Sequence, residues 1–345
     1  MKEDFYQIIS SDLDWKEFEN KTILITGANG FLPAYMVEVL LFLNQIKLQD
    51  KPCRVIALVR NKKHAQKRFY KYLNNNKFFL LVQDVSEPIQ LIEKIDYIIH
   101  AASPASPKYY KKDPLSVIMP NVFGTKNTLD LAVANNIDGY LYFSSGEVYG
   151  KLLPGEVMRE DNYGFLDSME LRNCYGESKR MGEIMCVSYA HQYNLPIKIV
   201  RPFHTYGPGM KLDDGRVFAD FVKNIINNEN IQLTSDGSAE RSFCYLSDAV
   251  IGFFTVLLKG KVKEAYNIAN PNQTISIKNL ALLLVTLFPE KKLSTSFIEQ
   301  KEDYLQSPIF SPVADITKIS ALNWKPTTTI HDGFKKTIMS FLNKE

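Results

Sequence analysis

The sequence has few residues of the kinds that hold metals or cross-link chains. Its 345 residues include four cysteines and five histidines, and neither group shows the spacing of a metal or redox site. We therefore expect reduced thiols and no metal. The cysteines are Cys53, Cys174, Cys186 and Cys244.

Net charge and long apolar runs are also limited. The formal net charge is +3, which is too small to indicate a nucleic-acid partner. No apolar run is long enough to span a membrane, and residues 1–5 are polar and acidic, unlike a secretory signal. We expect a cytoplasmic protein that binds neither nucleic acid nor a membrane.

A glycine-containing stretch near the start predicts a dinucleotide site. Thr22–Thr26 has the composition of a short buried strand, Gly27 and Gly30 break it, and residues 34–43 carry apolar side chains at helical spacing. A strand, a glycine turn and a helix together direct backbone N–H groups at a phosphate. Pro33 stands where a third glycine or alanine is usual, and an ordinary strand–turn–helix is the alternative interpretation.

Strands and helices then alternate along the first two hundred residues. This alternation predicts an α/β fold with a doubly wound parallel (Rossmann) sheet, whose ligands bind beyond the carboxyl ends of the strands. Further strands are predicted at 54–59, 78–82, 97–102, 140–145 and 197–201, and further helices at 115–134 and 174–193.

The sequence changes character after Pro202, where turn-rich pieces mix with short helices and strands. We predict a dinucleotide-binding domain with an N-terminal lead-in over 1–202. A smaller mixed α/β substrate domain is predicted over 203–345. Segments near 150–175 and 205–245 are expected to interleave the two.

The end of the second predicted strand bears on the choice of cofactor. An acidic residue often stands there to hold the adenosine ribose, but this chain has Arg60. Arginine can face a 2′-phosphate, which would allow NADP, and the alternative is a solvated helix face. After the third strand, Asp84 and Val85 could meet the adenine edge.

Tyr175 and Lys179 are the first candidates for chemistry. Residues four apart lie on one face of a helix, and an ammonium group can lower the pKa of a phenol so that it takes a proton from a sugar hydroxyl. Ser145, at the end of the preceding strand, can share that proton. A surface helix is the alternative for an isolated pair of this kind.

The motifs together resemble the extended short-chain dehydrogenase/reductase family, in its NAD-dependent epimerase/dehydratase group, over about residues 20–340. Within it the sequence is most similar to UDP-glucuronate decarboxylases. The resemblance rests on Thr26-Gly-Ala-Asn-Gly-Phe31, Ala102-Ser-Pro-Ala-Ser-Pro107, Ser144-Ser-Gly-Glu-Val-Tyr-Gly150, Cys174-Tyr-Gly-Glu-Ser-Lys-Arg180, Arg201-Pro-Phe-His-Thr-Tyr-Gly-Pro208, Asp214-Gly-Arg-Val217 and Arg241-Ser-Phe-Cys-Tyr-Leu-Ser-Asp248.

The resemblance implies a role for each matching position. Tyr175 would take the proton of the sugar 4-hydroxyl while NAD accepts the hydride from C4, and Lys179 would hold the nicotinamide ribose. The nucleotide-diphosphate sugar would meet Ser103, His204, Arg216, Arg241 and Tyr245. The other cofactor-binding positions are Gly27, Asn29, Gly30, Phe31, Leu32, Arg60, Asp84, Val85, Ala101 and Ala102.

Glu147 favours one reaction over its alternatives. A 4-epimerase needs no carboxylate there, whereas an enzyme that moves the C5 proton does. A 4,6-dehydratase also needs an acid to expel the 6-hydroxyl, and many place Asp where this chain has Gly146. Decarboxylation needs no such acid, because oxidation at C4 makes a β-keto acid.

Several alternatives stay open at this stage. Decarboxylation of UDP-glucuronate is the first hypothesis for the function. The second is 4,6-dehydration, or 4- or 5-epimerisation, of a related sugar. A non-catalytic dinucleotide sensor is the remote alternative. The family resemblance also implies a homodimer through the helix of Tyr175 and Lys179, with Met181, Met185, Val187 and Tyr189 as a possible face.

Overall fold

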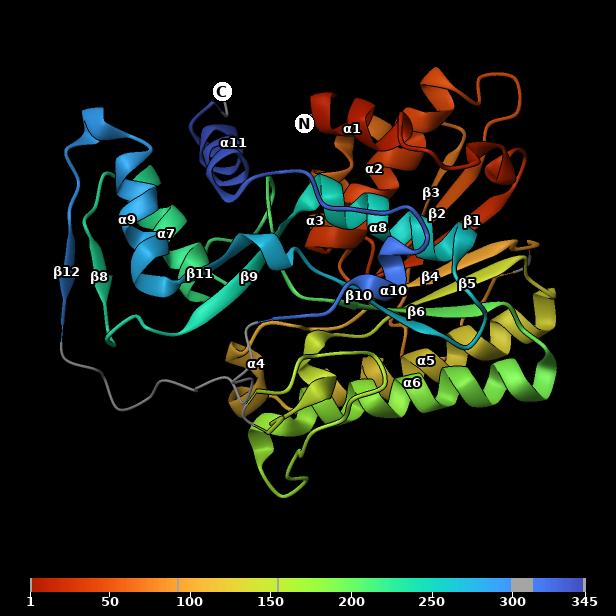
Figure 1. The fold of residues 1–345 in the computed structure, drawn as a ribbon. Helices are drawn as coiled ribbons and strands as arrows, with labels where there is room; N and C mark the ends of the chain where they lie inside the picture. Colours follow the sequence, from red (N-terminus) through yellow and green to blue (C-terminus); the bar gives the residue numbers. More distant parts are fainter. Residues whose placement is uncertain (1, 92, 154, 299–312, 344–345) are drawn as a thin grey trace.

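A parallel sheet forms the centre of the molecule. The computed structural model describes residues 2–343 apart from 92, 154 and 299–312, and within them seven strands pair in the order β10-β6-β5-β4-β1-β2-β3 (Figure 1). This confirms the predicted doubly wound α/β fold, whose ligand crevice lies where the strand order reverses, between β1 and β4. The strands are β1 (Thr22–Thr26), β2 (Arg54–Val59), β3 (Phe78–Val82), β4 (Tyr97–His100), β5 (Gly139–Phe143), β6 (Ile197–Pro202) and β10 (Ala265–Ile268).

Helices cover both faces of the sheet, because successive residues of a strand point to opposite sides. Ile23 and Ile25 of β1 join a core with the helices α1, α2 and α8, whereas Leu24 joins another core with α5 and α6 (Figure 1). The helices are α1 (Lys2–Ile9), α2 (Phe31–Ile46), α3 (Lys62–Arg68), α5 (Leu115–Asn135), α6 (Cys174–Tyr193) and α8 (Leu246–Lys259).

Two strands end earlier than predicted. β4 stops at His100, because the N–H groups of Ala101 and Ala102 donate to Thr26 Oγ1 (3.2 Å each) instead of to a neighbouring strand. β5 stops at Phe143, and Ser145 instead caps a short 3₁₀ helix, η3 (Gly146–Tyr149), by accepting the N–H of Glu147 (3.2 Å). Both departures turn the chain outward at the carboxyl edge of the sheet.

The chain beyond residue 202 contributes to the main sheet and also builds a smaller unit. β10 and α8 belong to the main layers, whereas the other elements surround a separate apolar core. The smaller mixed unit is confirmed, while the boundary at 202 and the interleaved segments stay predictions. Its elements are β7 (His204–Tyr206), β9 (Glu240–Tyr245) and β11 (Thr274–Ser276) in one sheet, β8 (Ile231–Leu233) paired with β12 (Thr295–Phe297), and α7 (Val217–Ile226), α9 (Ile277–Thr286) and α11 (Ile330–Leu342).

The N-terminal helix ties these layers together. Phe5, Ile8 and Ile9 are buried in the main core, and the Asp4 carboxylate accepts hydrogen bonds from the hydroxyls of Tyr35 (3.2 Å) and Tyr245 (3.1 Å). The remaining short elements are η1 (Trp15–Phe18), η2 (Tyr70–Tyr72), α4 (Lys108–Lys112), η4 (Leu171–Asn173), η5 (Pro271–Gln273), η6 (Pro289–Lys291) and α10 (Thr317–Ser320).

Candidate active site

The glycine turn after β1 has the geometry of a phosphate cradle. Gly27 has a φ of +63°, and a Cβ there would lie 2.6 Å from Cα of Ala102. Only glycine fits this close approach of two strand ends. Gly30 is the N-cap of α2 and makes no side-chain cap, so the first N–H groups of the helix are available to a pyrophosphate.

The other residues predicted at this turn lie beside the cradle. Asn29, Phe31 and Leu32 are partly exposed, and Ala101 and Ala102 follow β4 directly opposite Gly27. Phe31 packs against both the main core and the core of the smaller unit. Both cores therefore support the turn through Phe31, and the residues of the turn fit a dinucleotide.

Arg60 and Asp84 come together at the ends of β2 and β3. The Arg60 guanidinium lies 3.7 Å from the Asp84 carboxylate and is 66% exposed, while Val85 is buried against α5. The pair is placed as predicted, beyond adjacent strand ends. Acceptance of NADP through Arg60 stays a prediction, because an exposed arginine paired with a carboxylate can also be a surface ion pair.

Tyr175, Lys179 and Ser145 meet where β5 ends. Tyr175 opens α6, and the Ser145 hydroxyl lies near enough to its phenol to lower the pKa of that phenol, while Lys179 Nζ lies one turn later and donates to the Phe143 carbonyl (2.6 Å). Both α6 side chains are almost completely buried. The structure thus brings together the three groups that the spacing predicted for proton transfer.

Burial shifts the pKa values of Tyr175 and Lys179 in opposite directions. Burial raises the pKa of the Tyr175 phenol to about 12, although the hydrogen bond with Ser145 acts in the opposite direction. Burial likewise lowers the pKa of Lys179 to about 7. In the protein alone, desolvation of the phenolate therefore outweighs the neighbours that lower this pKa, and a lowering of the phenol pKa by the Lys179 ammonium stays a prediction.

Glu147 is held by an arginine that the sequence analysis missed. Arg172, in η4, places Nη2 at 3.4 Å and 3.2 Å from the two carboxylate oxygens of Glu147. Its guanidinium also lies 4.8 Å from the ring centroid of Tyr110, which stacks on Tyr175 at 5.3 Å. The available signal was the position of Arg172, three residues before Tyr175 and therefore near its helical face.

Three predicted substrate-binding residues gather in the smaller unit. The positive charges of Arg241 and Arg216 act on His204, whose pKa is lowered to about 3 by burial first and then by these two neighbours. Arg216 precedes α7 and forms an ion pair with Asp214 through Nε (2.7 Å) and Nη2. Arg241 is on β9, on the same strand face as Phe243, which is paired with His204. The result is a basic cluster suited to a diphosphate.

Ser103 and Tyr245, two predicted substrate contacts, differ in whether their hydroxyl groups already have a partner in the protein. Ser103 lies close to the Tyr175 phenol, and its hydroxyl is buried without a hydrogen-bond partner among the described residues, which leaves it for a ligand. Tyr245 is only 1% exposed, and its hydroxyl donates to Asp4 in α1. Its hydroxyl is therefore engaged within the protein, and the assignment of Tyr245 to the substrate stays a prediction.

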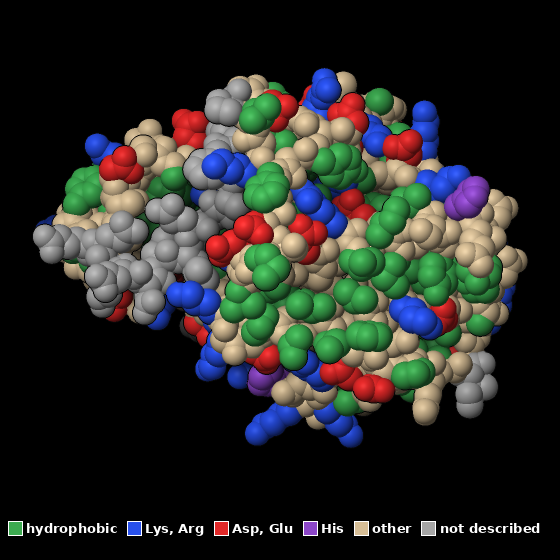
Figure 2. Space-filling model, turned by 90° about the horizontal axis from the view of Figure 1, so that it is seen from below, with side chains coloured by type: hydrophobic (Ala, Val, Ile, Leu, Met, Phe, Trp, Pro, Cys, Tyr) green, Lys and Arg blue, Asp and Glu red, His purple; other side chains and the backbone are tan. Residues whose placement is uncertain are grey.

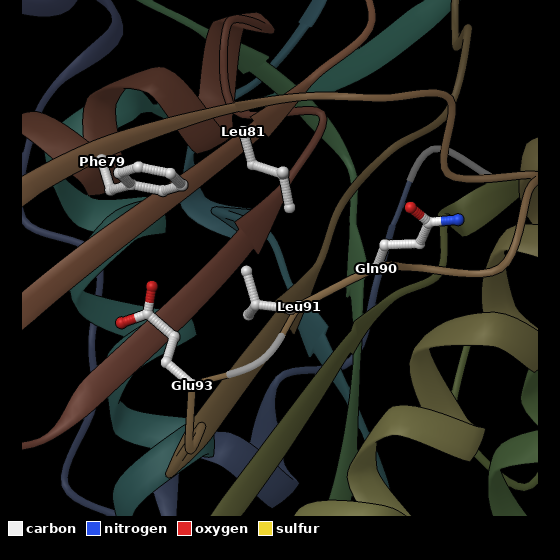
Figure 3. A pocket seen from close by; sticks show the side chains of 5 residues that line it. All are labelled: Phe79, Leu81, Gln90, Leu91 and Glu93. Carbon is white, nitrogen blue, oxygen red and sulfur yellow. The ribbon is translucent and has the colours of Figure 1, made fainter.

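A surface hollow lies at the edge of the sheet, away from these residues. Figure 3 shows side chains of the edge strand β3 and of the following segment around this hollow, which is lined by Phe79, Leu81, Gln90, Leu91 and Glu93. None of the residues assigned above to cofactor or substrate lines it. It is a shallow feature of the sheet edge and is separate from the candidate site.

The described part of the chain offers neither a metal-ligand cluster nor a membrane-spanning helix. No group of three or more histidine, cysteine, aspartate or glutamate side chains there could hold a metal ion. Across the same residues, no helix has both the length and the apolar character required to cross a membrane.

Known structures of similar shape are nucleotide-sugar enzymes. A UDP-glucuronic acid 4-epimerase from Bacillus cereus, in complex with UDP-glucuronic acid and NAD, superposes with a TM-score of 0.78 at 23% identity, covering 92% of this chain and 98% of that one. A dTDP-glucose 4,6-dehydratase from Bacillus anthracis, in complex with NAD, gives 0.77 at 20% identity, covering 94% and 97%. At these identities the likeness confirms the fold.

Sequence comparison gives the family. UDP-glucuronic acid decarboxylase 6 of Arabidopsis thaliana is 31% identical over 316 residues, covering 91% of this chain and 87% of that protein. UDP-glucuronic acid decarboxylase 1 of Xenopus tropicalis is 32% identical over 329 residues, covering 94% and 73%. The sequence model of the NAD dependent epimerase/dehydratase family matches residues 23–269. The chain, with its glycine cradle and its Ser145–Tyr175–Lys179 group, therefore belongs to the NAD dependent epimerase/dehydratase family, and NAD is its cofactor.

Proposed function

We propose that this enzyme decarboxylates UDP-glucuronate after oxidising C4 of the sugar. The observation that carries the proposal is the neighbourhood of Glu147. At Gly146, between it and Ser145, a Cβ would lie 2.9 Å from the Phe203 ring, so this position has little room for the acid that a 4,6-dehydratase uses. The identity of 31–32% to UDP-glucuronic acid decarboxylases over most of the chain supports the same reaction.

The first step is removal of the proton from the 4-hydroxyl. The Tyr175 oxygen takes this proton, and the nearby Ser145 hydroxyl stabilises the resulting charge. A bound NAD⁺ would supply the hydride acceptor for C4 and a positive charge that favours the phenolate. Lys179 is anchored on the Phe143 carbonyl one helical turn away and would hold the nicotinamide ribose.

Loss of carbon dioxide follows from the ketone at C4. The C5–C6 bond breaks, its electron pair moves into an enolate on O4, and C6 leaves as CO₂. Ser145 and the now protonated Tyr175 are placed to donate hydrogen bonds to that oxygen, as in an oxyanion site. Glu147 lies beside them and can pass a proton from solvent to C5. A bound cofactor would then return the hydride to C4, and Tyr175 would return its proton to O4.

The basic cluster would hold the rest of the substrate. Arg216 and Arg241 add positive charge that suits a doubly charged diphosphate, although Nε and Nη2 of Arg216 are bonded to Asp214. His204 is neutral at neutral pH, because its pKa is lowered to about 3 by burial and by the two arginines. It can therefore offer a hydrogen bond without adding to the charge.

The proposal is tested by measuring the mass of the reaction product. Purified protein is incubated with NAD⁺ and UDP-glucuronate, and we expect a product lighter by one CO₂. An unchanged mass with altered chromatographic retention would establish 4- or 5-epimerisation instead. Activity only on a neutral nucleotide hexose, with loss of water, would establish a 4,6-dehydratase, and no turnover on any of them would favour a sensor.

We also propose that the protein acts as a homodimer through α5 and α6. Figure 2 shows a band of hydrophobic side chains across the face where these helices lie. Met181 of the predicted face is 49% exposed, whereas Met185, Val187 and Tyr189 pack partly against the core. Sedimentation should show a dimer for the wild type and a monomer for a Phe123→Glu, Ile184→Glu variant. The exposed members of the band are Leu115, Met119, Phe123, Met181 and Ile184.

A further inference from the structure

Arg172 occupies an unusual place beside the reacting groups. Its side chain is only 13% exposed and is wedged between the Glu147 carboxylate and the ring of Tyr110, which in turn stacks on Tyr175. An arginine is the cation best suited to such a position, because its planar guanidinium stacks on an aromatic ring while its edge donates hydrogen bonds.

The hydrogen-bonding capacity of Arg172 is not used up by its neighbours. Nη2 alone approaches Glu147, at 3.2 Å and 3.4 Å, so the pair lacks the two parallel bonds of a bidentate ion pair. Its Nε is buried and finds no acceptor among the described residues. A buried donor without a partner costs free energy, and a bound anion would remove that cost.

The other cations of the site are more fully committed. Arg216 directs both Nε and Nη2 at one oxygen of Asp214, whose side chain is 7% exposed. Lys179 is fixed on the Phe143 carbonyl at 2.6 Å. Arg172 is therefore the cation next to Glu147 that can add a second anionic partner.

We infer that Arg172 selects a sugar with a carboxylate on C6 over one with a neutral hydroxymethyl group. The inference rests on the proposed function for the position of the sugar. With O4 at Tyr175, the carbons C5 and C6 extend toward Glu147. A carboxylate placed there meets the like charge of Glu147, and Arg172 offsets this repulsion and donates to the incoming oxygens. A neutral hexose is not repelled by Glu147 and has no carboxylate oxygens at C6, so it gains neither the charge compensation nor the carboxylate hydrogen bonds that Arg172 offers.

The test measures binding of two ligands that differ only at C6. Affinities of UDP-glucuronate and UDP-glucose are determined by calorimetry on wild type, Arg172→Met, Arg172→Lys and Arg159→Met, each loaded with NADH so that C4 is not oxidised during the titration. Arg159 is a matched control, since it is 59% exposed and its Nε lies 3.3 Å from Asp161 on the surface. Circular dichroism and NAD content verify that each variant is folded and loaded.

We expect the wild type and Arg159→Met to prefer UDP-glucuronate by at least about tenfold. Arg172→Met should lose that preference through weaker binding of UDP-glucuronate alone, and Arg172→Lys should recover part of it. A wild type without the preference, or an Arg172→Met variant that keeps it within about twofold, would overturn the inference.

The failure of the inference can be told apart from failure of the proposed function. If the wild type binds UDP-glucuronate selectively but releases no CO₂, the decarboxylase proposal fails. Loss of that selectivity in Arg172→Met would then still support Arg172 as the residue that selects the carboxylate. If CO₂ is released and selectivity is unchanged in Arg172→Met, the function stands and the inference fails.

Discussion

The cofactor end and the sugar end of the site differ in what faces the ligand. At the cofactor end the surface is mostly backbone, since Gly27 and Gly30 leave the start of α2 and the end of β4 uncovered. At the sugar end it consists of side chains from separate segments, among them Glu147, Arg172 and Arg216. A backbone surface recognises a diphosphate in any member of such a family, whereas side chains can be exchanged to suit a particular sugar.

Removing the Tyr175 hydroxyl should cause the largest loss of activity. The loss should come from the sugar end of the site, without a change in NAD binding. Tyr175→Phe keeps the ring that stacks on Tyr110, so we expect a loss of about 10³-fold in turnover, in the range typical of a general acid–base group. Bound NAD should stay at the wild-type level. The measurements are the rate of CO₂ release and the NAD content of the purified protein.

The control for this prediction is Tyr193→Phe, on the same helix but 46% exposed. It should leave both quantities unchanged. If Tyr175→Phe kept more than about a tenth of wild-type turnover, Tyr175 would not be the proton acceptor. If it lost NAD as well, the two ends of the site would not be independent.

A side chain at Gly27 should weaken NAD binding at the cofactor end of the site. In Gly27→Ala the new Cβ would lie 2.6 Å from Cα of Ala102 at a residue with a φ of +63°. We expect the free energy of unfolding to fall by about 2 kcal/mol. NAD affinity should fall by at least about tenfold, because the strand ends must separate. Urea unfolding and fluorescence titration with NAD measure the two effects.

Gly155→Ala separates crowding from backbone strain. Gly155 has a φ of +86°, but nothing lies within 4 Å of a Cβ built there. This variant should lose less stability than Gly27→Ala and keep its NAD affinity. Equal losses in the two variants would mean that the φ value, and not the contact with β4, requires glycine at position 27.

The smallest predicted effect concerns His204 and the dependence of stability on pH. Its pKa in the folded protein is lowered to about 3, by burial first and then by Arg241 and Arg216, from a model-peptide value of 6.5. Between these values the unfolded chain binds a proton that the folded protein does not, so His204 makes the fold less stable as pH falls below about 6.5. His204→Asn should therefore reduce the stability lost between pH 7.5 and pH 5 by about 1 kcal/mol, allowing for partial exposure.

Urea unfolding at the two pH values measures this effect, and His64→Asn on the exposed start of α3 is its control. The control should change the pH dependence by much less than His204→Asn. An unchanged pH dependence in His204→Asn would mean that His204 is neither buried nor close to the two arginines in solution.

Much of the fold could be predicted because its signals are local. Apolar runs fixed β1, β2 and β3 to the residue, and the helical spacing placed α6 at Cys174–Tyr193. The ends of β4 and β5 could not be predicted, since they depend on hydrogen bonds to Thr26 and within η3. The seventh strand, β10, was missed because a short edge strand has little pattern of its own.

The sequence by itself determined the glycine cradle, the order of strands and helices, and the types of residue that do the chemistry. These depend on neighbours along the chain, through backbone conformation and helical spacing. Only the tertiary structure decided that Tyr245 points to Asp4, that burial raises the pKa of Tyr175, and that Arg172 reaches Glu147. Such contacts join residues across the fold, and burial and charge take effect only once distant segments have packed together.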